Sequence, residues 1–93
     1  MLELVQIIQV QDRYKLETVF VNPKHIVRLS ENRHYSEILR EGKINLELNP
    51  ITTFTNIILN EGDRSSSLVV VGDPSIIESK LNKSFGKRTI LKG

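Results

Sequence analysis

Short runs of aliphatic and β-branched residues recur along this chain of 93 residues, and each run soon meets a turn-forming or charged segment. Leu2 to Val10 carries apolar residues on both faces of an alternating pattern, and Leu16 to Val21 is rich in valine, threonine and phenylalanine. Runs of this length and composition are typical of strands. The polar segment Gln11 to Tyr14 between them predicts a turn and therefore a first hairpin. The spacing restricts the chain to a sheet of short strands.

Further strands are predicted after the first hairpin. Asn22-Pro23 ends the second run because proline offers no N–H to a ladder. The turn at Glu61 to Arg64 contains a glycine that can adopt positive φ, so it predicts a second hairpin. The later strands are expected at residues 26–29, 44–48, 53–59 and 67–71, with a short strand-competent run at 88–91.

Residues 72–86 predict one helix. Asp73 is a good N-cap, and Pro74 suits the first helical position because its missing N–H is not needed there. Ile77, Leu81 and Phe85 form an apolar stripe, and Gly86 follows as a stop signal.

The resulting fold class is α+β and β-rich: an antiparallel meander of five or six short strands, with one C-terminal helix packed on the sheet. Residues 1–86 are expected to form a single domain, followed by a short basic tail at 87–93. Residues 30–43 leave two interpretations open. Ser36 could cap one helical turn that ends near Gly42, or the same residues could form a mobile loop.

Composition narrows the classes of protein. The chain has no cysteine, which excludes disulfides and thiolate metal sites and fits a reducing compartment. The first residues do not resemble a signal peptide, and no apolar run approaches the roughly 18 residues needed to cross a bilayer. We therefore expect a cytoplasmic protein with no membrane partner.

The net charge of +2 is unevenly distributed. Residues 1–77 carry eight Lys and Arg against ten Asp and Glu, whereas the last sixteen carry five basic residues against Glu78 alone. A basic end of this kind can contact nucleic acid or acidic protein, or it can serve only solubility.

The segment Val21-Asn22-Pro23-Lys24-His25-Ile26 resembles the small bacterial flagellar proteins of the FlbD/SwrD type. The turn Ile57 to Gly62 and the strand-to-helix step Val70 to Leu81 lie in the corresponding order. The resemblance implies an N-terminal hairpin, further short strands, and a last strand that leads into a helix. It implies no catalytic residues. The chain departs from the family across residues 32–52 and in its basic tail.

Motifs for chemistry are absent from the sequence. His25 and His34 lack a third ligand at a standard spacing, so no metal site is predicted. The serines at 65–67 do not lie in a nucleophile elbow, and no glycine-rich phosphate loop occurs. We therefore predict a protein that is not an enzyme, with no cofactor and no small-molecule substrate.

The remaining candidates are contact residues. Phe20 and Phe54 lie within apolar strands and are expected in the core. The leading hypothesis is an interaction module that self-associates or docks on a larger protein, and the alternative is nucleic-acid binding through the basic C-terminal helix and tail. The trio Arg33, His34 and Tyr35 could contact a partner or could equally be a plain polar loop. The candidate contact residues are Arg33, His34, Tyr35, Lys80, Lys83, Lys87, Arg88 and Lys92.

Overall fold

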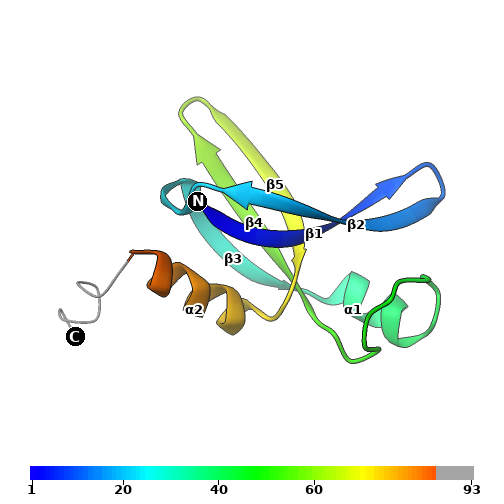
Figure 1. Ribbon diagram of the computed structural model, residues 1–93. Coiled ribbons are helices and arrows are strands. Elements are labelled where there is room, and N and C mark those ends of the chain that lie inside the picture. The colour runs from blue at the N-terminus through cyan, green and yellow to red at the C-terminus, as the bar shows by residue number, and fades with distance from the viewer. Residues whose placement is uncertain (86–93) are drawn as a thin grey trace.

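The structure is a computed structural model and describes residues 1–85. Five strands, two α-helices and a 3-10 turn follow one another along these residues (Figure 1). In chain order they are β1 (Leu2–Val10), β2 (Arg13–Val21), η1 (Pro23–His25), β3 (Ile26–Asn32), α1 (Arg33–Arg40), β4 (Phe54–Glu61), β5 (Arg64–Val71) and α2 (Pro74–Phe85).

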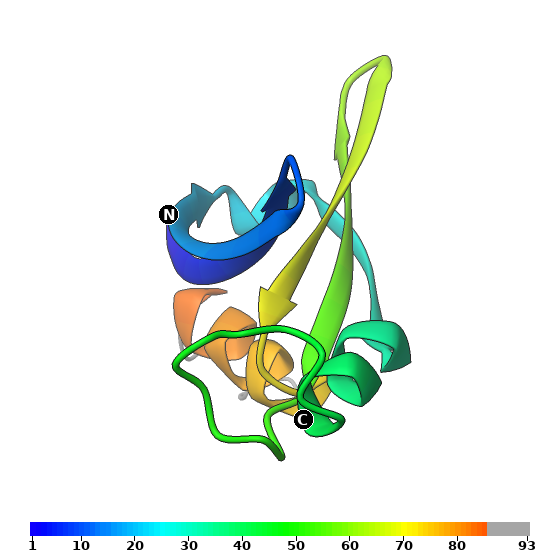
Figure 2. The same cartoon turned by 90° about the vertical axis from the view of Figure 1, so that its right-hand side faces the viewer.

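The strands form one antiparallel sheet in the order β2-β1-β5-β4-β3. The first strand therefore pairs with the last, through Gln6 opposite Val70. The two edge strands, β2 and β3, are joined only by the short η1, so the edges lie near each other at that end of a strongly curled sheet (Figure 2). The β4–β5 hairpin projects away from both helices in the same view.

Each face of the sheet has its own apolar core. On one face α2 places Ile77 against Leu4, Ile57 and Val70, all fully or almost fully buried. On the other face α1 and the loop at residues 41–53 cover Phe54, whose exposed fraction is 0%. Alternation along β4 sends its side chains to both cores, since successive residues of a strand point to opposite faces.

The predicted α+β, β-rich fold class is confirmed, with five antiparallel strands and a C-terminal helix in contact with the sheet. The strand order differs from the predicted meander, because β1 pairs with β5 while the consecutive strands β2 and β3 lie at opposite edges of the sheet. The first turn is shorter than expected, because only Gln11 and Asp12 form it and β2 already begins at Arg13. Gln11 adopts a positive φ of 57° in this two-residue loop.

The strand predicted at residues 44–48 is wrong. These residues belong to the loop after α1, where Ile44, Leu46 and Leu48 pack against the cluster around Phe54. Their alternation reflects a loop with one apolar side that lies across the sheet, and no ladder partner is present within residues 1–85.

A second helix resolves the two interpretations of residues 30–43. Helix α1 begins after Asn32, whose side-chain oxygen accepts the backbone N–H of Tyr35 at 2.9 Å. Ser36 is not the cap: it lies inside the helix and donates its hydroxyl to the Asn32 carbonyl at 3.0 Å. Gly42 follows the helix with a φ of 74°, a conformation that favours glycine, as expected.

Helix α2 begins as predicted. Asp73 accepts the N–H of Ser75 at 3.1 Å and also the Ser75 hydroxyl, and its carbonyl accepts the N–H of Ile77. Pro74 occupies the first helical position, and Ile77 and Leu81 face the core. The predicted stop at Gly86, the strand at 88–91 and the basic tail lie outside the described residues.

Asp73 gives the fold a testable pH dependence. The Ser75 hydroxyl, and then the Ser75 N–H, lower the pKa of Asp73 below its ordinary value. A depressed pKa means that the ionised cap stabilises the folded state above the unfolded-state pKa, and that this stability is lost as pH falls through the folded pKa. We expect the Asp73→Asn variant, which keeps a capping oxygen but not the charge, to melt below the wild type at pH 7.

The difference between the two melting temperatures should shrink as pH falls through the lowered folded-state pKa of Asp73, because the wild-type carboxylate becomes protonated there. Thermal melts followed by circular dichroism at successive pH values measure it. A difference that stays constant down to the lowest pH would contradict a stabilising charge at Asp73.

Candidate interaction surface

Two sheet edges and one end of the sheet are left uncovered within residues 1–85. Nothing in that part of the chain pairs with the outer edge of β2 or of β3. The loop at 41–53 and α1 cover the part of their face that carries Ile7, Tyr14, Leu16, Phe54, Val69 and Val71. The far end of the same face, where β2 runs into η1, carries no covering element among the described residues.

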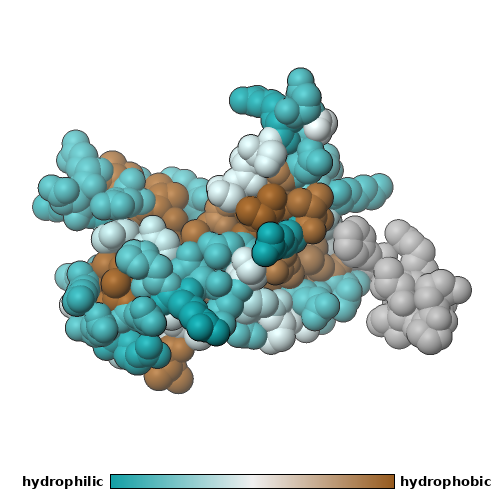
Figure 3. Space-filling view, turned by 180° about the vertical axis from the view of Figure 1, so that it is seen from behind, coloured by the Kyte–Doolittle hydropathy of each residue, from teal (hydrophilic) through white to brown (hydrophobic). Residues whose placement is uncertain are grey.

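An apolar patch occupies this uncovered end. Phe20, near the end of β2, is 61% exposed, and Val27, near the start of β3, is 59% exposed. Val5 on β1 lies diagonally from Phe20 on the same face, because Glu3 pairs with Phe20 and Val5 with Thr18. We call Val5 and Phe20 the basal patch. Seen from behind, apolar side chains gather at the base of the projecting β4–β5 hairpin (Figure 3).

The expectation for Phe20 is therefore wrong, whereas that for Phe54 is confirmed. Both phenylalanines lie in apolar strands, but α1 and its loop cover the face only where Phe54 and Tyr35 meet, with ring centroids 5.9 Å apart. Phe20 shares that face at the opposite end of β2, beyond the reach of the covering loop. Large exposed aromatics with neighbouring apolar side chains are a feature of contact surfaces.

The trio at residues 33–35 is divided by the structure. Tyr35 is part of the core around Phe54, and its ring stands edge-on to Tyr14 at 5.8 Å. Arg33 is exposed beside Glu31, at 3.4 Å, and His34 is exposed at the start of α1. Of the three, only Arg33 and His34 are exposed, because the half-buried tyrosine packs inside the protein.

The basic residues at the chain's end are divided between described and undescribed parts. Lys80 and Lys83 are exposed on α2, and neither forms a salt bridge within residues 1–85. They lie three residues apart, on neighbouring positions of one helical side. Lys87, Arg88 and Lys92 fall outside the described residues.

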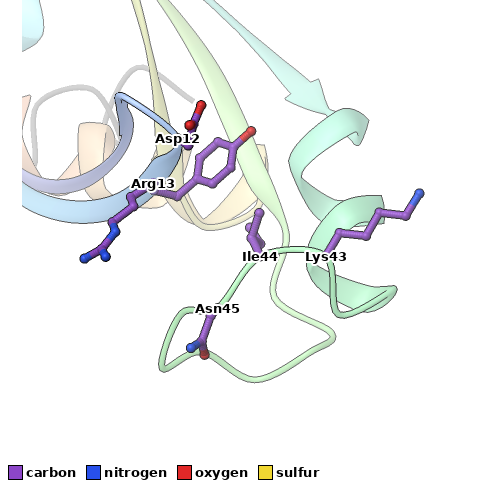
Figure 4. A pocket seen from close by; sticks show the side chains of 6 residues that line it. Asp12, Arg13, Lys43, Ile44 and Asn45 are labelled. Carbon is purple, nitrogen blue, oxygen red and sulfur yellow. The ribbon is translucent and has the colours of Figure 1, made fainter.

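A shallow hollow of about 480 Å³ lies between the β1–β2 turn and the loop after α1 (Figure 4). Asp12, Arg13, Tyr14, Lys43, Ile44 and Asn45 line it. The side chains of Arg13 and Lys43 point away from each other and do not converge on a common point (Figure 4). The hollow therefore lacks the convergent polar groups that fix the orientation of a small ligand.

The histidines are well separated in the fold. His25 lies in η1 with its Nδ1 3.5 Å from Glu61, and His34 lies in α1 beyond β3. Among the described side chains, no group of three or more His, Asp or Glu is placed to hold a metal ion. No helix in the described part of the chain is both long and apolar enough to cross a membrane.

Comparisons with protein-family models, with curated proteins and with solved structures find no match to this chain.

The division of the trio can be tested by stability. Tyr35→Ala removes an aromatic ring that contacts Tyr14 and Phe54, and we expect it to lower the free energy of unfolding by about 2–4 kcal/mol. Arg33→Ala, two residues earlier and exposed, should change it by less than about 0.5 kcal/mol. Urea denaturation measures both. Equal, small effects would contradict a core role for Tyr35.

Proposed function

We propose that this protein is a non-enzymatic interaction module that associates with a second copy of itself or with a larger protein through the basal patch. The exposed Phe20 is the observation that carries this proposal. A phenylalanine that is 61% exposed gains little from folding of the monomer, yet its burial in a complex would remove a large apolar area from water.

The position of the patch supports the same function. Val5 lies diagonally from Phe20 on the same face of the β1–β2 pair, so the aromatic ring has an exposed apolar neighbour and is not isolated. Exposed strand edges run from this end of the sheet along β2 and β3, and an edge can supply backbone hydrogen bonds to a partner. Anchoring aromatic residues with nearby backbone donors are a common basis for protein–protein recognition.

The sequence resemblance suggests a cellular setting for the proposal. The segment Val21 to Ile26, on which the FlbD/SwrD resemblance depends, builds the end of β2, η1 and the start of β3. Asn22 accepts the N–H of Lys24 at 3.0 Å there and so fixes the turn between the two edge strands. We propose, on that resemblance, an accessory role in the cytoplasm of a bacterium.

The basal patch can be tested with the full chain. Phe20→Ser should abolish self-association in sedimentation equilibrium, or the capture of a protein partner from native extract, because it removes the central apolar side chain of the patch. Its melting temperature should stay within a few degrees of the wild type, since the ring is mostly outside the core. Ile51→Ser is the matched control, because Ile51 is 78% exposed but lies in the loop at 41–53.

The Ile51 variant should associate like the wild type. A wild-type protein that stays monomeric at several hundred micromolar and captures the same proteins as Phe20→Ser would refute the proposed function.

Nucleic-acid binding is the second candidate, and the exposed pair Lys80 and Lys83 on α2 favours it. Cations that neutralise phosphates release counterions, so affinity should fall steeply as salt rises. We expect the double variant Lys80→Gln and Lys83→Gln to bind a labelled oligonucleotide more weakly. The slope of log affinity against log salt concentration should also fall, by the amount expected for the loss of about two phosphate contacts. Fluorescence anisotropy at several salt concentrations measures this. Unchanged binding and slope would remove α2 from any such site.

A further inference from the structure

The two uncovered edges differ in regularity. The β3 edge is interrupted by a bulge between Ile26 and Arg28, and β3 passes directly into α1. A bulge twists an edge away from pairing. The β2 edge has no such interruption, because β2 pairs with β1 residue for residue from Arg13 to Val21. Of the two, β2 is therefore the edge prepared to accept another strand.

The hairpin geometry determines which backbone groups β2 offers. Val10 and Arg13 close the two-residue loop and form the first hydrogen-bonded pair of the ladder. In an antiparallel ladder, hydrogen-bonded and non-hydrogen-bonded pairs alternate. The odd-numbered residues of β2 therefore direct their N–H and C=O toward β1. The residues that direct these groups outward are Tyr14, Leu16, Thr18 and Phe20.

A second copy could pair with this edge about a two-fold axis. Antiparallel pairing between two identical edges then places outward-directed residues opposite each other, so the axis passes beside a single residue of β2. An axis at Lys15 sets two lysines opposite each other, and one at Glu17 does the same with two glutamates. An axis at Tyr14 opposes Arg13 and Lys15, and one at Thr18 places Lys15 opposite the buried Val21.

An axis at Leu16 has a different outcome. It places Lys15 of each copy opposite Glu17 of the other, twice, because residues equally far from the axis pair. Both side chains are exposed and lie on the same side of β2. Opposite charges directly across a ladder attract, and like charges repel. This register is the one in which every charged pair between residues 15 and 17 is complementary.

We propose that two copies of this chain associate through their β2 edges, antiparallel, with Leu16 at the two-fold axis and two Lys15–Glu17 pairs across it. This inference gives the self-association branch of the proposed function a defined interface. The two sheets then become one continuous sheet, and the backbone groups of Tyr14, Leu16 and Thr18 bind those of the second copy. Phe20 of each copy then lies at the end of the paired segment, opposite Asp12 of the other copy, so the basal patch borders this interface.

Charge reversal tests the register with the full chain. Lys15→Glu and Glu17→Lys each create two like-charged pairs, so each should weaken dimerisation by about tenfold or more. The double variant restores opposite charges and has the composition of the wild type, so its dimerisation constant should return to within about threefold of it. Arg64→Glu, which makes the same change in net charge as Lys15→Glu but lies at the turn of the projecting β4–β5 hairpin, is the control and should dimerise normally. Sedimentation equilibrium at low salt measures all five proteins.

Several outcomes would overturn the inference. One is that all variants dimerise equally well. Another is that the double variant melts like the wild type but does not recover its dimerisation constant. A third is that the wild type is monomeric at every concentration. A dimer that resists both charge reversals but dissociates with Ile90→Asp would assign the contact to residues 86–93. A dimer that Phe20→Ser alone disrupts would refute the β2 register and leave the proposed function in place.

Discussion

Burial of β4 on both faces is the constraint on which the rest of this structure depends. Phe54 enters the core beneath α1, whereas Ile57 and Leu59 enter the core beneath α2. β4 also pairs along its length with β3 on one side and β5 on the other. Its two flanking strands and both helices are therefore positioned by a single strand. Thr55 completes the arrangement, because its buried hydroxyl donates to the Gly72 carbonyl at 2.6 Å and holds the chain where α2 begins.

The same arrangement explains why contact surfaces remain. A chain of this size has a thin core, and only one helix is available to each face of the curled sheet. α2 covers most of its face, but α1 is short, and its loop reaches only one end of the other face. The end of the sheet that carries Phe20 and the outer edge of β2 therefore remain uncovered. The surfaces proposed for association are thus consequences of how little chain is available to cover the sheet.

Local patterns predicted most elements of the fold, but not how they are arranged. Strand periodicity, the turn around Gly62 and the cap at Asp73 each depend on neighbouring residues, and the structure agrees with them. The alternation at 44–48 misled because a loop with one apolar side has the same period as a strand. The exposure of Phe20 and the burial of Tyr35 were not predictable, since both depend on where α1 lies relative to β2. No local signal reports the β1–β5 pairing.

The pairing of β1 with β5 has a consequence for synthesis. Gln6 meets Val70, so β5 must have left the ribosome before the first strand acquires its second neighbour. Contacts this distant in sequence close slowly, because much of the intervening chain has to be ordered first. Until then Leu2 and Leu4 have only β2 beside them and lack the core that later buries them. The growing chain would therefore expose apolar surface until β5 has emerged, which is the period in which a chaperone would be of most use to it.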